Sequence, residues 1–127
     1  MKRIVIYISV ICFAAIGIGL TGCYKDVISP ESDPDGPPQA VSFKEELQPL
    51  FNAKCATSGC HSVGAHHPYL TTEKSYQELN NGVYINTVIP KASLLYEKIN
   101  GEMSEYIPSP KDKQKVYDWI RNGAPNN

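Results

Sequence analysis

The chain has 127 residues, with 12 lysines and arginines against 13 aspartates and glutamates and a net charge of −1. This balance excludes the strongly basic surface that nucleic-acid binding requires, so we expect no nucleic-acid partner. No internal repeat is present. The four cysteines, Cys12, Cys23, Cys55 and Cys60, therefore carry the most information about chemistry.

Residues 1–22 have the layout of an export signal. A basic start, Met1-Lys2-Arg3, precedes the uncharged run Ile4–Leu20, which is slightly short for a membrane span. The next residues, Leu20-Thr21-Gly22-Cys23, resemble a lipoprotein signal-peptidase site. This resemblance implies cleavage before Cys23 and a lipid on its thiol. The alternative is an uncleaved helix, or an ordinary signal with an incidental cysteine.

Export and lipidation predict a protein of the cell envelope, held on a membrane that faces the periplasm or the cell surface. Tyr24, rather than Asp, follows Cys23, which favours the outer membrane by analogy with lipoprotein sorting. In this oxidising compartment unpaired cysteines are unusual. Because Cys12 leaves with the signal, Cys55 and Cys60 are either a disulfide or the two arms of a haem attachment.

Residues 23–40 are predicted to be a flexible tether. They are rich in proline and aspartate, as in Asp33-Pro34-Asp35-Gly36, and have few large apolar side chains with which to build a core. Residues 41–127 form one small domain. A domain of this size has a limited core and usually needs a disulfide, a metal or a cofactor as a staple.

The domain is predicted to be all-α, with about four short helices. The first begins at Ser42-Phe43-Lys44-Glu45, a capping box in which Ser42 accepts a first-turn amide and Glu45 reaches back to the Ser42 N–H. Pro49 should kink or split this helix, because proline removes a backbone donor. The apolar stripe of the helix is Phe43, Leu47, Leu50 and Phe51.

Three further helices are expected downstream. Stop signals of the Asn-Gly type and a Ser-Pro start give their bounds. They are Thr72–Asn80, Ser93–Ile99, and a last helix from Ser109-Pro110 to about Asn122-Gly123 that carries Val116, Trp119 and Ile120 on one face. Val83–Ile89 alternates loosely, a pattern compatible with an extended segment, and its pairing as a strand is left open.

The segment Cys55-Ala56-Thr57-Ser58-Gly59-Cys60-His61 suits covalent attachment of one haem c. Each thiol adds across a vinyl group, and His61 reaches the iron from one face. The usual attachment motif has two residues between the cysteines, and this chain has four. We expect the extra residues to bulge outward at Ser58-Gly59, since glycine tolerates a positive φ.

Met103 is the candidate for the second axial ligand. It is the one methionine outside the signal, and it lies in a loop of polar, glycine and proline residues, Gly101–Pro108. A methionine on a helix face is ordinarily a core filler. Here ligation gives the residue a role that helical periodicity does not. His66 and His67 are competitors, although so short a loop from His61 would have to pass around the haem edge.

Four features together resemble the bacterial class I cytochrome c domain, here as a monohaem variant with four residues between the cysteines. They are Phe51–Cys55 before the attachment site, Gly59-Cys60-His61, the methionine loop, and Trp119–Ala124 in the last helix. The similarity covers Val41 to about Pro125 and implies a small helical fold wrapped around one haem.

Carried onto this chain, the resemblance implies thioether bonds at Cys55 and Cys60, His61 as the proximal ligand and Met103 as the distal ligand. It also implies that the first and last helices cross, with Phe51 near Trp119. The chain departs from the family after the methionine, where proline is common. Here Ser104-Glu105 follow, and proline is delayed to Pro108.

These expectations favour an electron carrier rather than an enzyme. Two filled axial positions leave no open iron site, and the sequence has no paired carboxylates, nucleophile–base pair or phosphate loop. The expected partners are a redox protein as donor and another as acceptor, with a membrane respiratory complex among the candidates. Tyr69, Tyr96 and Tyr106 are candidates to bind haem propionates.

Two alternatives stay open. The first is a haem-based sensor or redox accessory domain in which Met103 dissociates and exposes the iron. The second is a haem-free lipoprotein with a Cys55–Cys60 disulfide. A zinc-binding version of the second would use Cys55, Cys60, His61 and His66, which are ligand types that tetrahedral zinc accepts.

Overall fold

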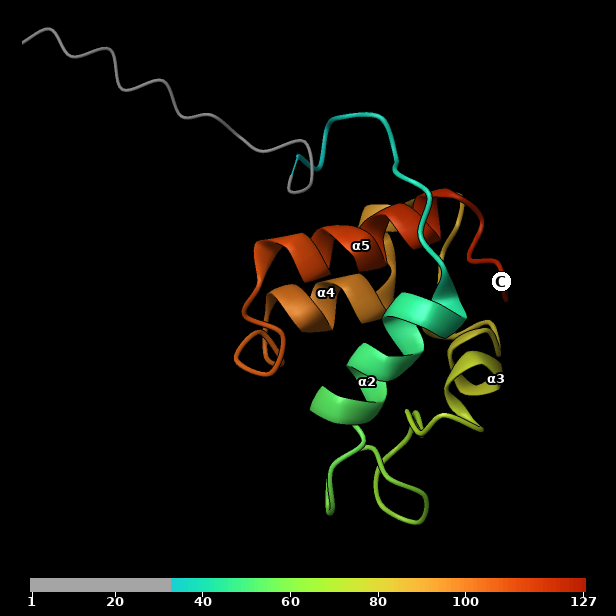
Figure 1. The fold of residues 1–127 in the computed structure, drawn as a ribbon, viewed down its shortest axis with the longest axis vertical. Coiled ribbons are helices and arrows are strands. Elements are labelled where there is room, and N and C mark those ends of the chain that lie inside the picture. The colour runs from blue at the N-terminus through green and yellow to red at the C-terminus, as the bar shows by residue number, and fades with distance from the viewer. Residues whose placement is uncertain (1–32) are drawn as a thin grey trace, which may run out of the picture.

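The structure is a computed structural model that describes residues 33–127 (Figure 1). Over this range the secondary structure is helical and contains no strand, which confirms the predicted all-α class. The elements are η2 (Phe43–Leu47, π-helical), α2 (Gln48–Lys54), α3 (Ser75–Leu79), η3 (Pro90–Ala92, a 3-10 turn), α4 (Leu94–Asn100) and α5 (Pro110–Arg121). None of these described helices has the length and apolarity of a bilayer span. The predicted signal, the lipidation at Cys23 and the tether up to residue 32 lie outside the described residues.

The first helix begins at the predicted cap. Ser42 Oγ accepts a hydrogen bond from the Glu45 amide at 3.2 Å. The carboxylate that accepts the Ser42 N–H belongs to Glu46, at 3.0 Å, and not to Glu45 as the capping box predicts. The cause is the wider π-type winding of η2, in which the Gln48 amide donates five residues back to Phe43 O. Each turn is one residue longer, so the reciprocal carboxylate comes one residue later.

Pro49 marks the change from π to α winding, and the predicted division of the first helix is confirmed. It lies in the first turn of α2, where the missing N–H leaves no hydrogen bond unmade. The helix then continues through fully buried Phe51 and ends at Lys54, so that Cys55 directly follows its last turn.

The last helix, α5, has the predicted bounds. Ser109 Oγ accepts the Asp112 amide at 3.3 Å, and Pro110 is the first helical residue. Gly123 ends the helix with a φ of +90°, a conformation that side-chain-bearing residues rarely adopt. The predicted inner face is confirmed, because Val116, Trp119 and Ile120 are all fully buried.

The middle of the chain is less regular than predicted. The expected helix Thr72–Asn80 is reduced to α3, because residues 71–74 form a tight turn in which Lys74 N and Ser75 N both donate to Thr71 O. The helix α4 agrees with its prediction to within a residue at each end. Val83–Ile89 consists largely of turns and bends, not the extended segment that its pattern suggests, and is tied to the start of α4 by a hydrogen bond from Asn86 N to Ser93 Oγ (2.9 Å).

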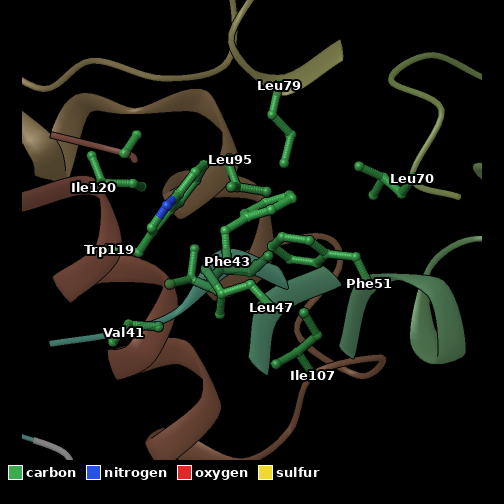
Figure 2. Close-up of a cluster of buried hydrophobic side chains, with 13 residues drawn as sticks. Val41, Phe43, Leu47, Phe51, Leu70, Leu79, Leu95, Ile107, Trp119 and Ile120 are labelled. Atoms are coloured by element: carbon green, nitrogen blue, oxygen red, sulfur yellow. The ribbon is translucent and has the colours of Figure 1, made fainter. Parts of the chain in front are cut away.

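The core is built around a cluster of aromatic rings (Figure 2). The Phe43 ring centroid lies 5.1 Å from that of Trp119 and 5.2 Å from that of Tyr76, the latter edge-on. Phe51 and Trp119, which the resemblance places near each other, both belong to this cluster, and Phe43 lies between them, 6.4 Å from Phe51. The first and last helices therefore pack through η2, and α2 is free to extend away toward the cysteine loop (Figure 1).

Residues 35–39 lie across α5, although they belong to the predicted tether (Figure 1). Arg121 Nη2 donates to Gly36 O at 2.7 Å, and the Gln39 amide donates to Asp118 Oδ2 at 3.2 Å. Asp118 is almost fully buried and also pairs with Arg121 Nη1 at 3.1 Å. Lys91 and Asp35 form an exposed ion pair beside them. This part of the tether is thus held on the domain.

We expect Phe43→Ala to lower the free energy of unfolding by about 3–5 kcal/mol, the usual loss for a buried phenylalanine that leaves a cavity among its neighbours. Urea unfolding followed by circular dichroism measures this change. Val88→Ala is the matched control, because the Val88 side chain is 88% exposed, and its effect should stay within about 0.5 kcal/mol. A loss below about 1 kcal/mol for Phe43→Ala would show that the ring cluster is not the core.

Candidate functional site

An apolar pocket of about 490 Å³ lies between α2, α4 and two loops, the one that follows α2 and the one that joins α4 to α5. Its apolar wall comes from the end of α2, from the segment after the cysteines and from one face of α4. These wall residues are Phe51, Leu70, Leu94, Leu95 and Ile99. Cys55, Cys60, His61 and Met103, which the sequence analysis singled out for one site, all line this same pocket.

The segment from Cys55 to His61 folds back on itself, so the two cysteines come to one side of the pocket. The His61 amide donates to Cys55 O at 3.0 Å, and the Cys60 amide donates to Thr57 O at 3.0 Å. The predicted bulge is confirmed, because Gly59 has a φ of +80° and the space beside its Cα is open. Thr57, Ser58 and Gly59 are exposed, although Gly59 also borders the pocket, and both cysteines remain at the pocket.

Both cysteines are half-buried free thiols in the structure. Burial raises the pKa of the Cys55 thiol to about 11, and the neighbouring Cys60 adds a smaller contribution in the same direction. Cys55 is therefore protonated at neutral pH and is a poor nucleophile by itself.

His61 is oriented through its ring nitrogen Nδ1. This atom lies 3.0 Å from Pro68 O and 3.3 Å from His66 O, both of which are acceptors. Nδ1 must therefore carry the proton, which leaves the lone pair on Nε2 for a metal. The Leu70 amide also donates to His61 O at 2.8 Å, so the backbone of residue 61 is fixed as well as its ring.

Met103 comes from a different wall, at the end of α4. Its amide donates to Lys98 O at 2.9 Å, a 6→1 hydrogen bond of the kind that closes helix C-termini. Lys98 and Glu102 form an ion pair on the same turn, at 2.7 Å. The side chain lines the pocket and is 36% exposed, so Met103 sits at the mouth rather than in the core.

His66 and His67 also line the pocket, and both are exposed. His66 lies on the same loop as His61, because its amide donates to Cys60 O at 2.9 Å. His67 is engaged elsewhere: its Nδ1 donates to Glu78 Oε2 at 2.7 Å, and its ring stacks on Tyr69 with centroids 4.0 Å apart. The hydrogen bond from His67 is the main cause that lowers the pKa of Glu78.

The zinc alternative finds no support in the geometry. Among residues 33–127, no three histidine, cysteine, aspartate or glutamate side chains are grouped so as to hold a metal ion. Cys55, Cys60, His61 and His66 all line the pocket, but they do not form a tetrahedral ligand set.

The structure adds pocket residues that sequence reasoning missed. Tyr84 lines the pocket and was not expected there. Of the three tyrosines that the sequence offers for the haem propionates, Tyr106 lines the pocket, whereas Tyr69 and Tyr96 are not among its lining residues. Tyr96 packs against Tyr117 instead, with centroids 4.6 Å apart. The Pro68 carbonyl is the other addition. Every residue has a backbone carbonyl, so residue type does not identify this acceptor. The one sequence signal is that Pro68 follows His61 by seven residues.

No protein-family model matches the chain, and no curated protein or solved structure does either. The resemblance to class I cytochrome c domains therefore stays a prediction from the motif residues.

We expect Cys55 to be slow to alkylate in the folded, haem-free chain. In a Cys60→Ser variant expressed without haem-maturation factors, iodoacetamide at pH 8 should modify Cys55 roughly 100-fold more slowly than in the same chain unfolded in urea, because the pKa is about two units higher. Since the thiolate fraction grows with pH, the rate should keep rising toward pH 11. A plateau near pH 9 would contradict the raised pKa.

Proposed function

We propose that this chain is a lipid-anchored monohaem c-type cytochrome that carries single electrons, with His61 and Met103 as the axial ligands. The observation that supports this most is the composition of one pocket. Two thiols, an imidazole with a free Nε2 and a thioether, from loops far apart in the sequence, all border one apolar space. Each is a group that haem c attachment or ligation uses.

The pocket fits the proposed group in size and character. A volume of about 490 Å³ lies within the range of pockets that hold large organic ligands, roughly 300–1,000 Å³. Its apolar wall suits the macrocycle. A small domain that turns this much apolar surface to a pocket has little left for its own core, so a bound apolar group would complete the packing.

Each of the four residues would hold the haem in a different way. The Cys55 and Cys60 thiols would each form one thioether, the sulfur bonding to one vinyl carbon while its proton goes to the other. His61 would hold the iron through Nε2 while Pro68 O keeps the proton on Nδ1. Met103 would offer its sulfur from the end of α4. The bound group would supply reversible one-electron oxidation and reduction of iron.

An electron carrier is favoured over an enzyme because both axial donors come from the chain. With those positions filled, no site on the iron is left for a substrate. Exposed Met103 and Tyr106 put the pocket mouth at the surface, where a redox protein can approach as donor or acceptor. The lipid on Cys23 and a place on the periplasmic or outer surface of the envelope belong to the same proposal and rest on the sequence.

Expression with haem-maturation factors should give one covalent haem per chain, detected after denaturation by the alkaline pyridine spectrum. Replacing both Cys55 and Cys60 with alanine should abolish the covalent spectrum, because no thioether remains. Thr57→Ala lies in the same bulge and should keep it. If the unaltered chain gives no covalent haem spectrum, the proposal fails and a haem-free lipoprotein is the better reading.

Met103→Ala should abolish the sulfur–iron charge-transfer absorption and lower the reduction potential, while covalent haem is retained. His66→Ala and His67→Ala are the matched controls, because both side chains line the pocket, and the absorption should survive in each. Survival of the band in Met103→Ala would refute the ligand assignment. Rapid carbon monoxide uptake by the reduced, unaltered protein near neutral pH would favour the sensor alternative.

A further inference from the structure

Glu78 bonds to both neighbours of Pro68. Its Oε2 atom accepts a hydrogen bond from His67 Nδ1 at 2.7 Å and another from the Tyr69 amide at 3.3 Å. The donors are two residues apart, so one carboxylate oxygen brackets the residue between them. Glu78 lies on α3, which runs beside the loop after the cysteines (Figure 1), and its side chain is only 20% exposed.

The bracketed residue is the one that orients His61. Pro68 is buried, and its carbonyl is the nearer of the two acceptors facing His61 Nδ1, at 3.0 Å. Proline has no N–H with which to anchor itself. The position of its carbonyl therefore depends on what holds the residues on either side.

We infer that Glu78 is a positioning residue for His61, acting through His67, Pro68 and Tyr69 to fix the carbonyl that accepts the Nδ1 proton. This inference rests on the proposed function, in which His61 Nε2 binds haem iron. A firm acceptor at Nδ1 keeps the ring in one tautomer and orientation and makes Nε2 a stronger donor. Loss of the two Glu78 hydrogen bonds would make Nε2 a weaker donor to the iron. The ferric state would then be stabilised less, so the reduction potential would rise.

A purely structural role for Glu78 makes a different prediction. The His67 side chain is 59% exposed, and ion pairs at such sites contribute little to stability and are screened by salt. If Glu78 acted only through its charge, its removal would shift the potential through space, and Glu78→Gln, which also removes the charge, would shift it as far as Glu78→Ala. A change transmitted through the Pro68 carbonyl would persist in salt.

The test compares three variants of the full chain loaded with haem. Glu78→Ala removes both hydrogen bonds, whereas Glu78→Gln removes the charge and keeps an oxygen acceptor. Glu73→Ala is the charge control, because Glu73 is exposed, lies in the turn before α3 and has a side chain of the same charge. Reduction potentials are measured at low salt and at about 1 M salt, where charges are screened beyond roughly 3 Å.

We expect Glu78→Ala to raise the potential at both salt concentrations and Glu78→Gln to restore most of the original value. Glu73→Ala should give a small shift that disappears in high salt. In the reduced protein, the slowly exchanging His61 Nδ1–H signal in ¹⁵N-resolved NMR should be lost in Glu78→Ala and kept in Glu78→Gln. The inference is overturned if the Glu78→Ala shift vanishes in high salt, or if the Nδ1–H signal stays protected.

A failure of the proposed function can be distinguished from a failure of the Glu78 inference. The denatured pyridine spectrum of the unaltered chain reports covalent haem independently of any Glu78 variant. If that spectrum shows none, the NMR comparison is made on the haem-free chain, where protection of His61 Nδ1–H still reports whether Glu78 fixes the Pro68 carbonyl. Unchanged protection there would refute the positioning role as well.

Discussion

Phe43 packs its ring against Trp119, and this contact determines where the pocket walls lie. It joins η2 to α5, and the chain end reinforces the joint, because Asn127 Oδ1 accepts the Phe43 amide at 2.8 Å and Trp119 Nε1 donates to Pro125 O at 2.8 Å. Since α2 continues directly from η2, the place of Cys55 follows from that joint. The aromatic core around Phe43 and Trp119 therefore positions α2, which forms part of the pocket wall.

The two donors proposed for the iron are held in different ways. His61 is fixed through both its ring and its backbone, by acceptors and donors within nine residues of it. Met103 is held through its backbone at the end of α4, with a partly exposed side chain. In such a site the geometry of the histidine donor is fixed in advance, whereas the methionine side chain can adjust. The hydrogen bonds of the 55–70 loop therefore matter more to the proposed ligation than the methionine loop does.

Local signals in the sequence predicted the helix ends well. Ser109-Pro110 and Gly123 give α5 its bounds because caps act within a turn, and Ser42 and Pro49 gave the start and the division of the first helix. The carboxylate that caps Ser42 was assigned one residue early, since π winding has no clear signature in residue type. Phe43 between Phe51 and Trp119 was missed because periodicity places side chains on a face without saying which one meets a distant helix. The cysteines, His61 and Met103 were found by type, whereas Tyr84, the Pro68 carbonyl and Glu78 depend on contacts that only the fold creates.

Because residues 35–39 lie across α5, the start of the described chain is held away from the pocket. No residue of α5 or of residues 33–41 lines the pocket, and the cysteine loop lies at the opposite end of the domain (Figure 1). With a lipid on Cys23, as proposed, nine residues (24–32) separate the anchor from the described chain, which limits the span to about 30 Å. The bonds of Asp118 and Arg121 to this segment hold the start of the described chain on α5, at the end of the domain away from the cysteine loop. If the lipid and the haem are bound as proposed, a redox partner would reach the pocket from the end of the domain opposite residues 35–39.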